Sequence, residues 1–116
     1  MSTCSQLIHT LESGGCDQAL ASLYALDGSA RRLDEARARC VRTAEAFAAR
    51  FGADVQDAAL FSGPGRTEIG GNHTDHQHGR VLCGSVDLDM LACAAPNGLD
   101  VVRIHSEGYP ALEISL

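Results

Sequence analysis

Residues 63–79 have the sequence GPGRTEIGGNHTDHQHG and lie between a part of the chain that predicts helices and a part that predicts strands. Glycines stand at both ends of the segment, and Ile69 is its only apolar side chain of any size. So many polar groups are not needed for packing, because cores are built from apolar side chains. The segment therefore predicts a loop that forms a site, carried on a scaffold of helices and strands.

Upstream of this loop, residues 1–55 predict a helical leader. Thr3 followed by Gln6 fits a capping box, and the apolar residues after it recur at helical spacing until Gly14. A short second helix is expected to start at Asp17. Its expected apolar face consists of Leu20, Leu23 and Tyr24.

The third expected helix has the clearest pattern, because its apolar residues keep helical spacing from Leu33 to Phe51. The residues between them on this face are Ala36, Cys40, Ala44 and Phe47. Gly52 follows directly, and a glycine at this place is typical of a helix end.

After residue 57 the sequence predicts strands in place of helices. Residues 58–62 form a short apolar run before glycine and proline, which indicates a buried strand. Residues 81–86 and 88–95 predict two strands or one long bent strand. Residues 96–98 are a turn signal, and further strands are expected after it at residues 99–106 and 111–116. This order indicates an α+β domain, and we expect its sheet to be incomplete.

Length and composition restrict the classes of protein to which this chain can belong. Its 116 residues suffice for one domain, and a hydrophobic content of 45% is typical of globular proteins. The net charge of −6 argues against nucleic acid as a partner, since phosphate binding needs clustered basic residues. Five of the nine basic residues, all arginines, fall within residues 31–42, where we expect a solvated helix face.

The cysteines and the N-terminus indicate a reducing compartment. The count of 5 cysteines is odd, and no pair has the C-x-x-C spacing of a zinc or redox site. We therefore expect free, buried thiols in a cytoplasmic protein. The chain begins without the segments of a signal peptide, and no apolar stretch approaches a membrane span in length, so no membrane partner is expected.

The loop residues suit recognition of a polar small molecule. Residues 63–65 let the backbone turn tightly and let a ligand approach closely. Arg66 carries a permanent charge that binds phosphate or carboxylate as a fork. Asn72, His73 and Asp75 offer neighbouring donors and acceptors, as recognition of vicinal hydroxyls requires. In an extended segment, His73 and Asp75 would project to the same side. These features indicate a small ligand that receives or carries phosphate.

A metal site and a solvated polar loop are the alternatives. The cluster H-x-D-H-x-H contains ligands that zinc accepts, and it consists of His73, Asp75, His76 and His78. In an extended strand His76 and His78 would face away from the other two, so we expect loop residues and no metal site. A solvated loop would use its Asp and Asn only as capping residues. A Walker-type nucleotide site is excluded, because the chain has neither lysine nor G-x-x-x-x-G-K-[ST].

Residues 65–76 closely resemble the galactokinase signature of the GHMP small-molecule kinase superfamily, usually G-R-x-N-[LIV]-I-G-[DE]-H-x-D-Y. The resemblance covers about residues 58–116. It implies the beginning of a GHMP-kinase N-terminal domain, with a mixed sheet like that of domain 2 of ribosomal protein S5. The chain would then divide into a helical leader at 1–55 and a partial galactose-binding domain at 56–116.

The resemblance also implies a role for each matching residue. Arg66 would be catalytic, lying beside the anomeric hydroxyl and the transferring phosphoryl group and stabilising the developing negative charge. Asp75 would accept hydrogen bonds from ring hydroxyls, while Asn72 and His73 would contact the hydroxymethyl end of the sugar. Galactokinases phosphorylate the C1 hydroxyl of galactose in the Leloir pathway with ATP and Mg²⁺, so galactose is the expected substrate.

The sequence departs from the family pattern within the signature. The departures are Glu68 for Asn, Gly70 for Ile, Asn72 for an acidic residue and His76 for Tyr. The change at Asn72 leaves kinases of related sugars open, N-acetylgalactosamine and galacturonate among them.

Two motifs of the family are absent from residues 1–116. One is the serine-rich ATP loop, which holds phosphate at a helix N-terminus, and the other is the catalytic aspartate after it. We therefore expect the N-terminal part of a galactokinase, truncated within its first domain, with no cofactor-binding residue and no activity alone. A free-standing galactose-binding or regulatory module is the alternative, since some family members act as sugar sensors.

Overall fold

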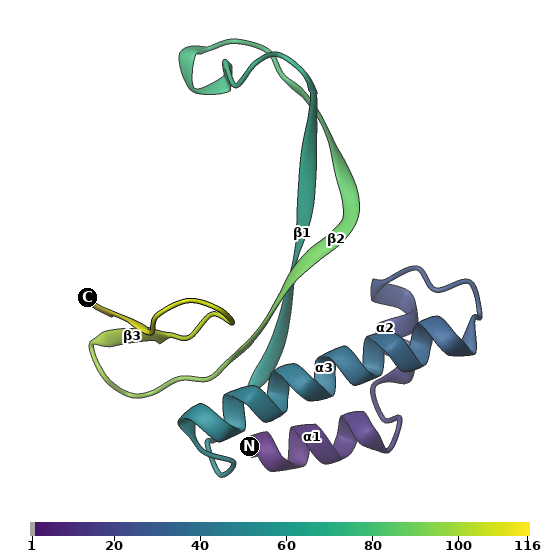
Figure 1. The fold of residues 1–116 in the computed structure, drawn as a ribbon, viewed down its shortest axis with the longest axis vertical. Helices are drawn as coiled ribbons and strands as arrows, with labels where there is room; N and C mark the ends of the chain where they lie inside the picture. The colour runs from purple at the N-terminus through teal and green to yellow at the C-terminus, as the bar shows by residue number, and fades with distance from the viewer. Residues whose placement is uncertain (1) are drawn as a thin grey trace.

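The computed structural model describes residues 2–116, without the side chain of Asp75 (Figure 1). Within these residues, three helices come first and two separate two-stranded antiparallel sheets follow. The prediction of an α+β protein is therefore confirmed, whereas the division at residues 55 and 56 stays a prediction. Across the described residues, no helix combines the length and apolar character that a membrane span needs.

Helix α1 (Cys4–Glu12) begins at the predicted capping box. The amide of Gln6 donates to Thr3 Oγ1 at 3.2 Å, and the amide of Thr3 donates to Gln6 Oε1 at 2.8 Å. These two bonds satisfy backbone donors that the first turn of a helix leaves unpaired. The sequence signal for this helix start is confirmed.

Helix α2 (Asp17–Leu23) begins at the predicted residue, but its predicted apolar face is wrong at one position. Leu20 is buried, and Tyr24 packs against the same core. Leu23, in contrast, is 62% exposed. The reason is that α2 contacts the core through Leu20 and Tyr24 and leaves Leu23 on its outer side.

Helix α3 (Ala30–Phe51) is the longest helix of the described chain, and it follows the predicted pattern except at its last residue, Phe51, which is exposed. Cys40 and Ala44 are buried on its inner face. Gly52 ends the helix with a φ of +114°, a conformation that side chains with a Cβ rarely adopt. The predicted helix and its predicted end are both confirmed.

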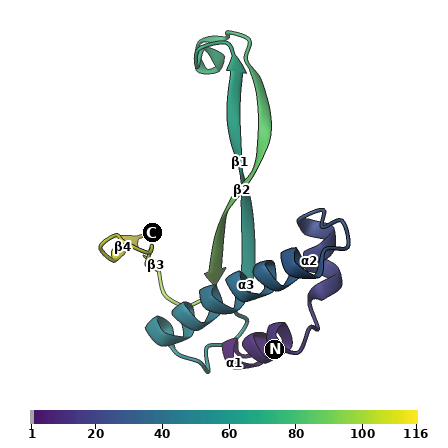
Figure 2. The ribbon, with the colours of Figure 1, turned by 45° about the vertical axis from the view of Figure 1, so that its right-hand side comes forward.

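The core is small and lies between the helices and the base of a hairpin. Its buried members are Leu11, Leu20, Cys40 and Ala44. Leu60 and Leu91 pack against it from strands β1 (Ala59–Gly70) and β2 (Leu82–Ala94). One face of the hairpin base thus rests on the helices, and the hairpin extends away from them (Figure 2).

Strands β1 and β2 form one long antiparallel hairpin, which corrects one prediction and confirms another. Pairing runs from Ala59 opposite Ala94 to Gly70 opposite Leu82, so residues 63–70 are strand and not loop. Local sequence favoured a loop there, but β2 supplies the cross-strand hydrogen bonds that stabilise an extended conformation. The predicted alternative of one long strand is confirmed for β2.

The predicted buried strand at residues 58–62 is buried only in part. Ala58 is buried and Leu60 packs on the core, but Phe61 is 59% exposed. Side chains alternate between the two faces of a strand, and only the face carrying Leu60 and Ser62 meets the helices. Phe61 lies on the opposite face, which no described element covers.

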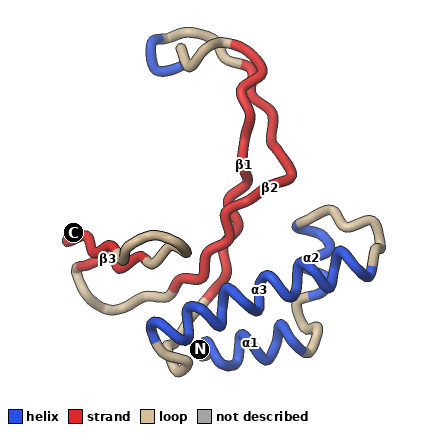
Figure 3. The backbone as a smooth tube through the Cα atoms, viewed as in Figure 1, coloured by secondary structure: helices blue, strands red, loops and turns tan. Residues whose placement is uncertain are grey.

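Strands β3 (Val101–Ile104) and β4 (Leu112–Ser115) form the second hairpin (Figure 3). The predicted turn before β3 is present. Asn97 Nδ2 donates to the carbonyl of Val101 at 2.9 Å, and the amide of Leu99 donates to Asn97 Oδ1 at 2.9 Å. Both predicted C-terminal strands are therefore confirmed.

A polar cluster around Asp89 joins the helices to the first hairpin. Its carboxylate accepts hydrogen bonds from Tyr24 Oη at 2.9 Å, from Ser62 Oγ at 2.5 Å and from Arg39. Arg39 also donates to the backbone carbonyl of Asp89 at 3.0 Å. Burial would raise the pKa of Asp89, but the bonds from Ser62, Arg39 and Tyr24 outweigh it and hold that pKa below its usual value.

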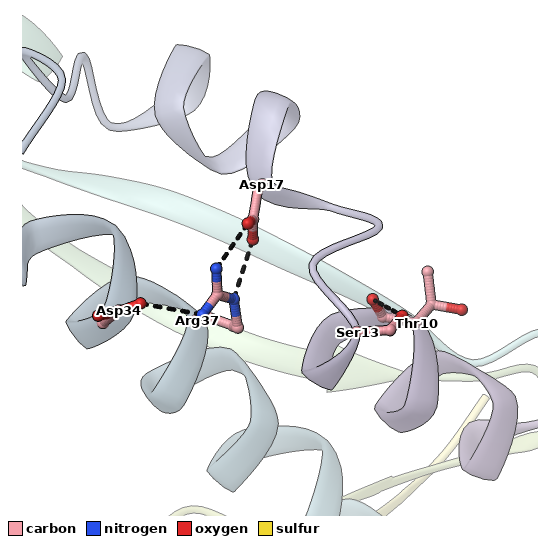
Figure 4. Close-up of polar contacts among 5 residues, drawn as sticks. All are labelled: Thr10, Ser13, Asp17, Asp34 and Arg37. Atoms are coloured by element: carbon pink, nitrogen blue, oxygen red, sulfur yellow. Dashed lines mark hydrogen bonds and ion pairs between the residues drawn. The ribbon is translucent and has the colours of Figure 1, made fainter. Parts of the chain in front are cut away.

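The predicted solvated arginine face of α3 is wrong for two of its arginines. Arg39 binds Asp89, as above, and Arg37 binds Asp17 through Nε at 2.9 Å and Nη2 at 2.5 Å. Figure 4 shows Arg37 between Asp17 and Asp34, to which it also donates at 2.9 Å. The carboxylates that bind them belong to α2 and β2, which are distant in sequence, so the helical pattern of α3 does not reveal these contacts.

The cysteine prediction is confirmed for oxidation state and corrected for burial. All five thiols are free, and Cys4 and Cys40 are buried. Cys16 and Cys93 are half-buried, and Cys83 is exposed. Cys83 is exposed because it lies in the outer part of the hairpin, opposite Glu68 and away from the helices.

We expect Asp89→Asn to lower the free energy of unfolding by about 2 kcal/mol. The amide carries no charge, and its NH₂ group would face the donors that bond the carboxylate in the wild type. Urea unfolding followed by circular dichroism measures this loss. Asp87→Asn is the matched control, since that side chain is 87% exposed and lies 3.7 Å from Arg32. It should change stability by less than about 0.5 kcal/mol. Equal losses in both variants would contradict the role of Asp89.

The pH dependence of stability should report the same cluster. Because folding lowers the pKa of Asp89, its contribution is fully present above the ordinary aspartate pKa of about 3.9. The contribution is lost as the pH falls through the lower pKa of the folded state. Urea midpoints measured from pH 5 downward should therefore fall less steeply for Asp89→Asn than for the wild type, and parallel curves would argue against this linkage.

Candidate functional site

The candidate site lies at the end of the first hairpin that is remote from the helices (Figure 1). Strand β1 leads into it with Arg66 and Glu68, and a loop follows from residue 71 to residue 81. The loop contains one turn of 3-10 helix, η1 (Asp75–Gln77). The polar segment identified in the sequence is therefore half strand and half loop.

Arg66 lies on β1 opposite Ser85, and its side chain is exposed. Among the described residues it has no hydrogen-bond or ion-pair partner, so its guanidinium is available to an anion or a hydroxyl group. Arg66 and Glu68 are two residues apart in a regularly paired stretch, so both project from one face of the strand. Their positions are roughly 7 Å apart along it.

Asn72 and His73 are exposed and both have a positive φ, of 52° and 55°. The left-handed conformation costs a residue with a Cβ about 1 kcal/mol or more, and asparagine tolerates it better than histidine. Such a pair persists only where the surroundings hold it. The extended conformation assumed for His73 and Asp75 is wrong, because His73 is left-handed and Asp75 begins η1.

Glu68 is the site residue whose contribution the sequence did not reveal. Its carboxylate accepts the backbone amide of His73, at 3.0 Å to Oε1 and 3.2 Å to Oε2. Oε2 also lies 3.6 Å from His73 Nε2. The available sequence signal was its departure from the asparagine that is usual at this position.

The loop is closed by contacts of Thr74 and by two glycines. The carbonyl of Thr74 accepts the amides of Gln77 at 3.0 Å and Gly79 at 2.7 Å, while Thr74 Oγ1 donates to the carbonyl of Gly71 at 2.8 Å. A Cβ at Gly79 would lie 2.1 Å from Thr74 Oγ1. A Cβ at Gly71 would lie 2.6 Å from the carbonyl oxygen of Arg80. Both positions therefore require glycine.

Asp75 and the two other histidines of the loop lie in or beside η1. His76 belongs to η1, and His78 follows it with a φ of 61°. The side chain of Asp75, predicted to bind ring hydroxyls, lies outside the described part of the structure. Among the described side chains, no three of His, Cys, Asp or Glu lie together as metal ligands. Nor does the sequence supply an ATP loop.

This geometry can bind a small polar ligand. The exposed loop presents backbone and side-chain donors and acceptors, and the neighbouring strand presents an arginine without a partner among the described groups. Hydroxyl groups need both kinds of partner, while phosphate favours the guanidinium.

Comparison with known proteins identifies the segment that carries this site. Residues 45–96 match the family described as "Galactokinase galactose-binding signature". Two galactokinases, from Lactococcus lactis subsp. lactis and subsp. cremoris, are each 33% identical to the chain over 70 residues. The alignment covers 60% of this chain and 17% of each relative's length. No solved structure matches the chain. The chain thus carries the galactose-binding signature and is a distant relative of galactokinases over a partial region.

We expect Gly71→Ala to open the loop, because its Cβ would overlap the backbone at Arg80 and the φ of +120° would be strained. Trypsin cleavage after Arg80 should become about tenfold faster, since it follows the open population. Gly70→Ala is the matched control, because a Cβ there meets nothing within 4 Å. Equal cleavage rates in the two variants would contradict the closed loop.

Proposed function

We propose that this chain provides the galactose-binding part of a galactokinase, an enzyme that transfers a phosphoryl group from ATP to the C1 hydroxyl of galactose. The observation that carries the proposal is the galactose-binding signature at residues 45–96. This range runs from the last turns of α3 through β1, the loop and β2. It therefore includes every residue of the candidate site.

In this proposal the four site residues contact different parts of the sugar. Asn72 and His73, exposed at the end of the hairpin, bind the hydroxymethyl end. Asp75 accepts hydrogen bonds from ring hydroxyls and selects the galacto configuration. Arg66, on the neighbouring strand, binds near the anomeric hydroxyl, where its charge stabilises negative charge that develops during transfer.

The proposal includes a GHMP-kinase fold, with residues 1–55 as a leader and residues 56–116 as part of the sugar-binding domain. It also includes ATP and Mg²⁺ as the phosphoryl donor and its metal ion, for which residues 1–116 contain no serine-rich ATP loop. By itself the 116-residue polypeptide would bind sugar without phosphorylating it.

We expect His73→Asn to weaken galactose binding by the 116-residue chain about tenfold, the effect of losing one hydrogen bond of about 1.4 kcal/mol. Isothermal titration calorimetry measures the dissociation constant. His78→Asn is the matched control, because this histidine also has a positive φ in the same loop and asparagine tolerates that conformation. His78→Asn should bind within about twofold of the wild type.

Two further measurements delimit the proposal. Titration with glucose, N-acetylgalactosamine and galacturonate should give weaker binding than galactose, and preference for one of these sugars would reassign the substrate. A coupled assay of ADP release with galactose and ATP should read background. A wild-type chain that binds none of the sugars would overturn the proposed function.

A further inference from the structure

The exposed start of the loop is held by a side chain from strand β1. Glu68 accepts the His73 amide with both carboxylate oxygens, at 3.0 and 3.2 Å. Its side chain is only 22% exposed, whereas that of His73 is 82% exposed. The acceptor is thus anchored on β1, and the group that it holds belongs to the loop.

This contact stabilises a part of the backbone that is conformationally strained. Asn72 and His73 are consecutive left-handed residues, neither of them glycine. The hydrogen bonds of Thr74 close the following part of the loop, but they do not reach the amide of His73. Among the described groups, Glu68 alone bonds that amide. It therefore favours the conformation that presents both side chains to a ligand.

The register of the hairpin explains how Glu68 reaches the loop. Glu68 pairs with Cys83, and the pairing then shifts before Gly70 opposite Leu82. Such an irregularity bends a strand and redirects its side chains. The carboxylate is also 3.6 Å from His73 Nε2, so it faces both the backbone and the ring of the same residue.

We propose that Glu68 is a positioning residue for sugar recognition, which fixes the left-handed pair Asn72–His73 by accepting the His73 amide. This inference rests on the proposed galactose-binding function. Glu68 does not touch the ligand; it raises the fraction of loops that are ready to bind. An apparent dissociation constant rises in inverse proportion to that fraction, so a tenfold loss of the competent conformation weakens binding tenfold.

Three variants of the 116-residue chain test the proposal. Glu68→Ala removes the acceptor, while Glu68→Gln keeps an oxygen that can accept the same amide. Glu45→Ala is the control for charge, because Glu45 is exposed on α3, far from the hairpin end. For each variant, NMR measures the hydrogen-exchange rate of the His73 amide, and calorimetry measures the dissociation constant for galactose.

We expect Glu68→Ala to accelerate exchange of the His73 amide and to weaken galactose binding, each about tenfold. Glu68→Gln should stay within about threefold of the wild type in both measurements, and Glu45→Ala should match the wild type. A merely electrostatic role would make Gln as poor as Ala, which would overturn the proposal.

The two measurements separate this inference from the proposed function. Unchanged exchange of the His73 amide in Glu68→Ala overturns the positioning role, whether or not sugar binds. Faster exchange with unchanged galactose affinity also overturns it, because the loop conformation then does not limit binding. If the wild type binds no galactose at all, the proposed function fails and the recognition role of Glu68 fails with it, while the exchange data still establish its hold on the loop.

Discussion

The structure depends on one largely buried carboxylate, that of Asp89, which joins the helices to the long hairpin. Arg39 from α3, Tyr24 after α2 and Ser62 from β1 all donate to it. An isolated two-stranded hairpin is at best marginally stable in water. The core between helices and strands contains few large buried side chains. The hydrogen bonds to Asp89 are therefore important for fixing the orientation of the hairpin relative to the helices. Removing the carboxylate would leave three donors without their common acceptor.

The far end of the hairpin is organised by different means. None of α1, α2 and α3 packs against it, and its shape comes from contacts within residues 66–85. Glu68 holds the start of the loop, Thr74 closes it, and Gly71 and Gly79 permit the close backbone approach. The site is thus placed by packing at the base of the hairpin and shaped by local hydrogen bonds at its end.

The galactose-binding signature spans both the base and the far end of the hairpin. Its 45–96 range begins in α3 and ends just after β2, so it contains Asp89 as well as the loop. The sequence alone predicted a binding site of Arg66, Asn72, His73 and Asp75, and the structure adds that the first three are exposed. The sequence did not identify Glu68 as the residue that holds His73, because the contact depends on a left-handed backbone and a shifted strand register. Neither feature has a local pattern in the sequence.

The sequence by itself determined the helices, since helical spacing, a capping box and Gly52 act between residues a few positions apart. It also determined the chemical character of the loop. Only the tertiary structure decided that residues 63–70 are a strand, because their hydrogen-bond partners lie in β2. The same holds for Arg37 and Arg39, which solvent would otherwise surround and which the fold pairs with Asp17 and Asp89. Interactions between distant residues form only when packing brings their partners together, and helical periodicity does not encode them.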